Sequence, residues 1–296
     1  MKRLYIKFMP TDQSLEIAKE IAEKMGYEFD DNKTKSLSID LHVLYFNEIL
    51  RKLNINPKTL SFQDGSIGKI EASIVPDLGN SGCIFFDDQL SFWLSNMCLL
   101  NSIATFTIPD EEEYKRLAYL FNSSLDCARK PYLHESSRDG FKPILLQYPD
   151  CLRVSDDLSK GMIVFIICHE IAHASSNHLH QVQDSNLELE ADELGFKYYN
   201  QIVAHPKRTG YISLTNDFLI APVLLMYYFD ILEKYNFKIT KRPPDRSSHP
   251  SPKSRADRLT TSLQKLNNEK VNDLLESFLA GLNDLTEELD LPDDLD

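Results

Sequence analysis

Residues 161–173 read Gly-Met-Ile-Val-Phe-Ile-Ile-Cys-His-Glu-Ile-Ala-His, so an apolar run leads directly into two histidines. The run favours a buried helix, and the four-residue spacing of His169 and His173 places both rings on one helical face. Two imidazoles on that face can bind one zinc ion. Glu170 lies about 100° around the helix, where its carboxylate can take a proton from a zinc-bound water. The alternative is a helix surface with two solvated histidines, and the apolar run argues against it because it places the motif near a core.

A catalytic zinc needs a third protein ligand, and a pair of carboxylates follows the histidines in the sequence. Residues 187–195 read Leu-Glu-Leu-Glu-Ala-Asp-Glu-Leu-Gly, which places Glu188 and Asp192 on one helical face. One carboxylate could bind zinc while the other accepts the free N–H of a ligand histidine. Glu190 lies about 200° from Glu188 and is the weaker candidate. The alternative for Glu188 is a helix cap on the surface, because Ser185 to Glu188 fits the capping box Ser-x-x-Glu.

Two further histidines fall in the expected turn between these helices. We expect the first helix to run a turn or two past His173 and the chain to reverse near residues 180–184. His178 and His180 stand five and seven residues beyond His173, which takes them off its helical face. We expect surface or supporting roles for both, although either is an alternative ligand.

The chain divides near residue 150 into two regions of different character. In residues 1–150, periodicity predicts strands at 4–8, 69–75, 83–86 and 143–148, and helices at 14–25, 41–53, 88–104 and 110–128. Later helices are expected at 158–177, 185–204, 218–235, 252–266 and 269–289, with a proline-rich irregular loop at 241–254. We therefore expect an α+β fold, with a mixed α/β N-terminal region of unknown role (1–150) and a mainly helical C-terminal region (151–296).

Composition narrows the class of protein. The 296 residues carry a formal net charge of −13, which argues against nucleic-acid binding because that needs a basic surface. Nine acidic residues and no Lys or Arg follow Lys270, so the C-terminal region ends in an acidic tail.

The sequence also predicts where the protein is found. No apolar run reaches the roughly 18 residues of a membrane span. Lys7 interrupts the apolar start of the chain, so we expect no signal peptide and a cytoplasmic protein. Five widely spaced cysteines argue against a disulfide framework.

The motifs resemble those of the gluzincin metallopeptidases, and most closely the HtpX-type proteases, the CAAX prenyl endopeptidases and their soluble relatives. His-Glu-Ile-Ala-His with a further histidine at His178 is similar to the first motif of that family. Glu-Leu-Glu-Ala-Asp is similar to the second motif, whose first Glu, here Glu188, is the third zinc ligand. Ser-His-Pro-Ser-Pro-Lys-Ser-Arg is similar to a downstream His-Pro-x-x-x-x-Arg motif and corresponds to His249 and Arg255. The resemblance covers residues 158–266 and implies a zincin-like fold for the C-terminal region.

The chain also departs from that family. It lacks a spanning segment, the gap between its first two motifs is shorter, and its first 150 residues match none of the family's features. Its length, soluble character and compact motif spacing also resemble the Lit-type phage-exclusion proteases, which are zinc peptidases that cleave a translation elongation factor. The peptidases that cleave immunity repressors share the first motif but continue differently in the second.

The resemblance and the residues together predict a soluble zinc-dependent endopeptidase that hydrolyses a protein or peptide substrate. Zn²⁺ would be bound by His169, His173 and Glu188, with Glu170 as the general base and Asp192 orienting a ligand. One alternative is a triggered defence protease, which stays silent until an activating partner is present. Another is a non-catalytic binding protein that keeps a vestigial zinc site.

Two features outside the zinc motifs bear on this prediction. His249 or Arg255 could reach over the zinc and stabilise the oxyanion of a tetrahedral intermediate. The alternative is that His249 and Pro250 form a turn and that Arg255 is an ordinary charge on the next helix. An extended peptide could lie on a candidate edge strand at 143–148.

Overall fold

The computed structural model describes residues 37–56, 59–65, 72–77, 81–129, 144, 147–181, 184–204, 212–247, 249–292 and 295. The expected strand at 4–8 and the expected helix at 14–25 lie outside these residues. Within them the chain is mostly helical and carries one small sheet, so the expected α+β fold with a helical C-terminal half is confirmed.

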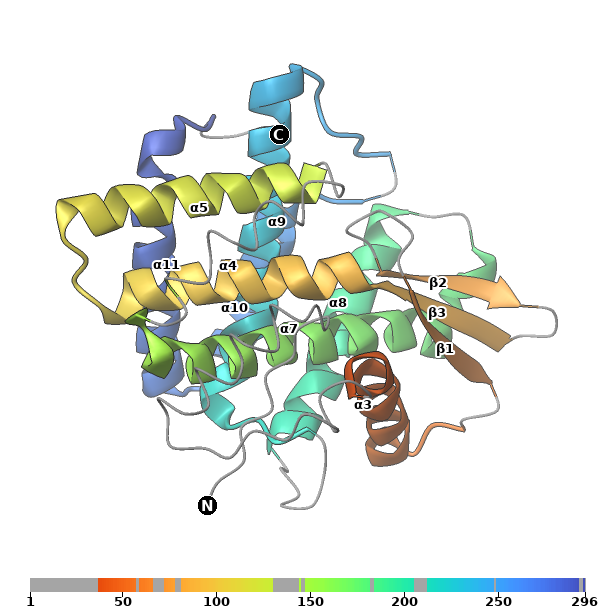
Figure 1. Cartoon of the computed structure of the whole chain (residues 1–296). Helices are drawn as coiled ribbons and strands as arrows, with labels where there is room; N and C mark the ends of the chain where they lie inside the picture. Colours follow the sequence, from red (N-terminus) through yellow and green to blue (C-terminus); the bar gives the residue numbers. More distant parts are fainter. Residues whose placement is uncertain are drawn as a thin grey trace.

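A long helix, α7 (Pro149–Ser175), runs through the middle of the molecule and ends beside the sheet (Figure 1). Pro149 lies in the first turn of α7. Proline is tolerated there because backbone N–H groups in a first helical turn have no acceptor within the helix. From Leu158 to His173 almost every residue is buried, as expected of a helix that is apolar on nearly all sides. The two histidines of the motif therefore lie inside the protein, at the end of α7 that meets the sheet.

Helices from both halves of the sequence surround α7. Asp87 caps the helix that begins at Asp88 by accepting a hydrogen bond from the Gln89 backbone N–H at 2.7 Å. The other helices of the described residues are α3 (Leu37–Leu53), α4 (Asp88–Phe106), α5 (Glu111–Arg129), α8 (Ser185–Ala204), α9 (Ala221–Thr240), α10 (Pro252–Gln264) and α11 (Glu269–Thr286). Short 3₁₀ segments stand at η2 (His178–His180), η3 (Asn216–Ile220) and η4 (Glu287–Leu289).

The sheet has three strands in the order β1-β3-β2, namely β1 (Leu60–Gly65), β3 (Ser81–Asp87) and β2 (Ala72–Asp77). β1 runs parallel to β3, and β2 runs antiparallel to it with Ile74 opposite Ile84. β2 is thus an edge strand of this sheet, and it packs against the C-terminal part of α7. This contact places an edge strand of the described sheet next to the histidine motif.

One hydrophobic core connects the two regions that we separated near residue 150. Side chains of α3, α4 and α5 belong to the same buried cluster as those of α7, α9 and α11. Trp93 on α4, for example, stacks against Phe229 on α9 with ring centroids 5.6 Å apart. The division at residue 150 stays a prediction, while the packing shows that both regions contribute to the same interior.

The structure corrects three of the expected elements. The expected strand at 143–148 is wrong, because Ile144 and Gln147 are helical and the Tyr148 N–H donates to the Ile144 carbonyl, a helical bond of 3.0 Å. α7 begins at Pro149 rather than at residue 158. α9 begins at Ala221 rather than at residue 218, because Pro222 fits only in a first helical turn. The expected helix at 185–204 is confirmed with these bounds.

No helix of the described residues is long and apolar enough to cross a membrane. This finding agrees with the sequence, which predicts no spanning segment.

Candidate metal centre

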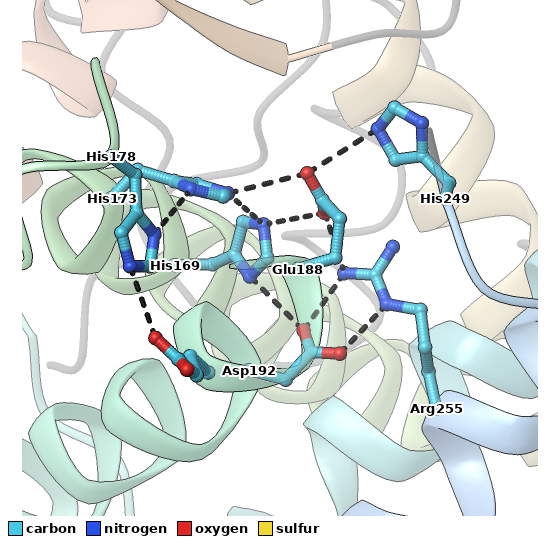
Figure 2. Close-up of polar contacts among 8 residues, drawn as sticks. His169, His173, His178, Glu188, Asp192, His249 and Arg255 are labelled. Atoms are coloured by element: carbon cyan, nitrogen blue, oxygen red, sulfur yellow. Dashed lines mark hydrogen bonds and ion pairs between the residues drawn. The ribbon is translucent and has the colours of Figure 1, made fainter. Parts of the chain in front are cut away.

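The two motif histidines meet on the buried face of α7. The Nε2 atoms of His169 and His173 lie 3.1 Å apart, and each residue is less than a tenth exposed. The spacing of four residues on a regular helix is what brings the two rings together. Both Nε2 atoms face α8, which supplies the carboxylates of the site (Figure 2).

α8 packs closely along α7 because a glycine removes the side chain between them. A Cβ added to Gly195 would lie 3.0 Å from the Cα of His169 and 3.1 Å from its backbone nitrogen. Glu188, Asp192 and Gly195 share one face of α8 because they follow the helical spacing of four and three residues. The glycine therefore allows α8 to lie close enough for its carboxylates to contact the histidines.

Glu188 completes a group of three possible metal ligands. Its Oε2 lies 3.4 Å from the Nε2 of His169, and its Oε1 lies 3.5 Å from the Nε2 of His173. One ligand atom from each of the three residues lies within 4.8 Å of the others, so this buried group can hold a metal ion. The N-terminal turn of α8 is capped instead by Asp184, whose Oδ1 accepts from the Asn186 N–H at 3.2 Å. Glu188 is thus buried in the site and does not lie on the surface.

Asp192 lies behind His169, on the side away from Glu188. Its Oδ1 is 3.0 Å from the Nδ1 of His169. Arg255 from α10 donates to the same carboxylate through two nitrogens, Nε at 2.7 Å and Nη2 at 2.8 Å. This two-point pair fixes the plane of the carboxylate, and the Arg255 guanidinium also lies 3.8 Å from Glu188. The network joins α7, α8 and α10 around His169 (Figure 2).

His173 has a different partner on its outer side. Its Nδ1 lies 3.1 Å from the Nδ1 of His178, and the Nε2 of His178 lies 3.3 Å from the Oε2 of Glu190. His178 belongs to η2, just after α7, and is buried. The chain reaches this position because Asn177 adopts a left-handed conformation with φ of 58°, which asparagine tolerates better than most residues.

Glu170 lies beside the metal-ligand group without belonging to it. Burial raises the pKa of its carboxyl to about 7, although nearby His169 and Arg255 and a hydrogen bond from the Ile74 backbone oppose the rise. Ile74 belongs to the edge strand β2. The structure therefore holds a buried carboxyl, with its pKa raised toward neutrality, between the candidate ligands and the edge strand β2.

The charges of the site set the pKa values of the ligand group itself. Burial alone would lower the pKa of His169, but its contacts with Asp192 and Glu188 raise that pKa to about 9. Burial and the nearby His169 lower the pKa of His173 to about 4. Burial alone would raise the pKa of Glu188, but the contact with His169 and the charge of Arg255 hold it at about 2. The carboxylates therefore favour positive charge at this group, as a cation site requires.

His249 approaches the group from the proline-rich loop before α10. Its Nε2 lies 3.5 Å from the Oε1 of Glu188, and its side chain is 48% exposed. Residues 241–247 and 249–251 of this loop form no helix or strand, in agreement with the expected irregular segment. Figure 2 shows His249 on the opposite side of Glu188 from the Asp192 carboxylate.

A cavity of about 660 Å³ opens onto these residues. Its walls include the candidate ligands, Glu170, His249 and Arg255, together with four residues of β2. One helical turn before the histidines, the lining becomes apolar, with Phe165 and Ile166 of α7 facing side chains of α4 and α9. One part of the cavity wall is therefore polar and consists of the candidate ligands and their neighbours, and the adjacent part is apolar.

No family model matches this chain, and no curated protein or solved structure matches it either. The resemblance stated from the motifs therefore rests on those motifs alone.

The structure brings together every site residue that the sequence predicted, namely His169, Glu170, His173, Glu188, Asp192, His249 and Arg255 (Figure 2 labels all but Glu170). Sequence reasoning missed the contact of Ile74 with Glu170, which no motif signals. It also left the role of His178 open and considered Glu190 only as a ligand. One signal in the sequence bears on His178. Asn177 follows the motif helix directly, and asparagine tolerates the positive φ that turns His178 back toward His173.

Proposed function

We propose that this chain is a zinc-dependent endopeptidase, with Glu170 as its general base. The observation that carries the proposal is the juxtaposition of the buried group His169, His173 and Glu188 with the buried Glu170 carboxyl at a cavity beside an edge strand. Two imidazoles, one carboxylate and a neighbouring acid form the residue set that a hydrolytic zinc site uses.

The donor atoms of the group fit zinc. Two imidazole nitrogens and one carboxylate oxygen match a catalytic zinc site, which keeps its fourth position for water or substrate. Calcium and magnesium take oxygen ligands instead. In addition, the Nδ1 of each histidine lies near a partner on its outer side, Asp192 for His169 and His178 for His173. Such partners orient ligand histidines and keep Nε2 available.

A zinc ion in this group would polarise a peptide carbonyl and lower the pKa of a bound water. Glu170 would accept a proton at its carboxylate and return it to the leaving amine. Before zinc binds, burial raises the pKa of this carboxyl to about 7, so it lies among groups that can both take and give a proton near neutral pH.

The two remaining predicted residues receive different roles in this proposal. Arg255 directs its Nε and Nη2 to Asp192, so we assign it to holding the carboxylates of α8. His249, half exposed and 3.5 Å from Glu188, is the better candidate for donating a hydrogen bond to the oxyanion of the reaction.

The position of β2 in the cavity wall favours a peptide as the substrate. β2 is an edge strand of the described sheet, and four of its residues line the cavity. An extended peptide can pair with such an edge through main-chain hydrogen bonds, which would lead it past Glu170 and the candidate ligands. β2 takes over the role that the sequence assigned to residues 143–148.

The test is a comparison of wild type with Glu170→Gln, both loaded with zinc and incubated with casein, with products identified by mass spectrometry. We expect wild type to cleave and Glu170→Gln to retain zinc but lose most activity. Glu193→Gln is the matched control, since it removes an exposed acid of α8 that pairs with Arg258 at 3.6 Å, and it should cleave like wild type.

The outcomes separate the alternatives. Equal cleavage by wild type and Glu170→Gln would refute the mechanism. Cleavage that appears only after a host or phage extract is added would indicate a triggered protease. If the zinc-loaded wild type cleaves nothing and Glu170→Gln binds zinc equally well, the result would support the non-catalytic binding protein.

A further inference from the structure

The outer side of His173 is supported by a chain of two contacts that reaches the protein surface. The first joins the Nδ1 atoms of His173 and His178 at 3.1 Å, and the second joins the Nε2 of His178 to the Oε2 of Glu190 at 3.3 Å. The side chain of His178 is 3% exposed, while that of Glu190 is 66% exposed. A buried histidine thus connects a candidate ligand to a carboxylate at the surface.

Which atom can donate a proton in each of these two contacts follows from the chemistry of the groups. If His173 binds a metal through Nε2, its neutral ring carries the proton on Nδ1. The Nδ1 of His178 must then accept the hydrogen bond that the Nδ1–H of His173 donates. A neutral His178 therefore carries its own proton on Nε2. That N–H points at Glu190, which can only accept when ionised. One arrangement of protons therefore satisfies every group in the chain.

His178 cannot itself be a ligand of the same ion in this arrangement. The Nδ1 of His178 contacts the Nδ1 of His173. The other ring nitrogen of His173, Nε2, faces the ligand group and lies 3.5 Å from the Glu188 carboxylate. His178 lies on the far side of the His173 ring from the ligand group (Figure 2).

The local fold is built so that His178 returns to this place. Five residues along a continued helix would turn His178 about 140° away from His173. Asn177 breaks the helix with its positive φ, and η2 then packs against β2. Leu179 anchors the turn, since its Cδ1 would lie 3.2 Å from a Cβ placed on Gly82 of β3.

We propose that His178 and Glu190 are positioning residues that orient the His173 ring and fix its proton on Nδ1, so that Nε2 is free to bind the metal. The inference rests on the proposed metal site and extends it. The two histidine ligands are then supported differently, since His169 meets the buried Asp192 directly, while His173 depends on a relay that ends at an exposed acid.

The test measures zinc affinity by competition with a chromophoric chelator, using zinc alone as the probe. The variants are His178→Phe, Glu190→Gln, the double variant and Glu193→Gln as the control for loss of one α8 charge. We expect His178→Phe to weaken zinc binding by about 10- to 100-fold. Glu190→Gln should weaken it less than His178→Phe but more than Glu193→Gln.

The double variant separates a relay from a general structural effect. Because Glu190 acts through His178, adding Glu190→Gln to His178→Phe should cause no further loss, whereas independent effects would multiply. Multiplying effects, or wild-type affinity in both single variants, would overturn the inference. Glu190 is exposed, so its variant keeps the test valid if His178→Phe does not fold. Failure of wild type to bind zinc would instead refute the metal site on which the inference rests.

Discussion

Gly195→Ala probes the close contact between α7 and α8 that the site requires. The new Cβ would lie 3.0 Å from the Cα of His169 and 3.1 Å from its nitrogen. Optimal carbon contacts lie at about 3.5–4.0 Å, so the two helices must separate by roughly 0.5 Å. Both neighbouring atoms are backbone atoms, which cannot turn aside as a flexible side chain would.

The size of the effect can be worked out separately for stability and for metal binding. Alanine favours a helix over glycine by about 0.8–1.0 kcal/mol, while overpacking costs about 1–3 kcal/mol, so the free energy of unfolding should fall by at most about 2 kcal/mol. Glu188 lies on the same helical face as Gly195, and ligand distances tolerate only about ±0.2 Å. Zinc affinity should therefore fall by at least about tenfold.

The assay pairs chelator competition for zinc with chemical unfolding of the same sample. Ala191→Gly is the control, because Ala191 is fully buried on the same helix and its replacement costs helix propensity, about 1 kcal/mol, without adding an atom between the helices. We expect Ala191→Gly to lose stability and keep its zinc affinity. Wild-type zinc affinity in Gly195→Ala would refute the argument from helix spacing.

Two further predictions concern the carboxylates and the pH dependence of the site. Asp192→Asn removes the two-point partner of the Arg255 guanidinium and leaves it only Glu188, at 3.8 Å. Unfolding free energy should drop by up to about 3–5 kcal/mol, against less than about 1 kcal/mol for the exposed Glu193→Gln. Equal losses in denaturant titrations would contradict the role of the buried pair. His169 has a pKa of about 9 and must lose its proton to bind zinc, so the apparent association constant should rise about tenfold per pH unit from about pH 7 and level off above about pH 9. Affinity that is flat over this range in chelator titrations would show that His169 carries no competing proton.

Local rules predicted α8 and the part of α7 that carries the histidines, although α7 begins at Pro149 rather than at residue 158. Residues 185–204 form the expected helix with unchanged bounds, as their helical periodicity predicted, although Asp184 caps it rather than the box from Ser185 to Glu188. The spacing of four residues within each pair placed His169 and His173 on one face of α7, and Glu188 and Asp192 on one face of α8. In the structure these two faces contact each other. Helical geometry determines which residues share a face within each helix.

Contacts between distant segments could not be predicted in the same way. Nothing in the sequence near Ile74 indicates that its backbone reaches Glu170, and the pairing of Arg255 with Asp192 depends on how α10 packs on α8. The expected strand at 143–148 failed because Ile144 and Gln147 take helical conformations, although the apolar residues there also suit a short strand. Such short apolar runs fit either element.

The most direct test of the account is the metal content of protein purified without added metal or chelator, measured by mass spectrometry beside Glu188→Ala. We expect about one zinc per chain in wild type and a large loss in the variant, because Glu188 supplies the third ligand. Circular dichroism of both samples would confirm that the variant is folded. Absence of zinc from wild type even after zinc is offered, or equal zinc in both proteins, would contradict the central claim.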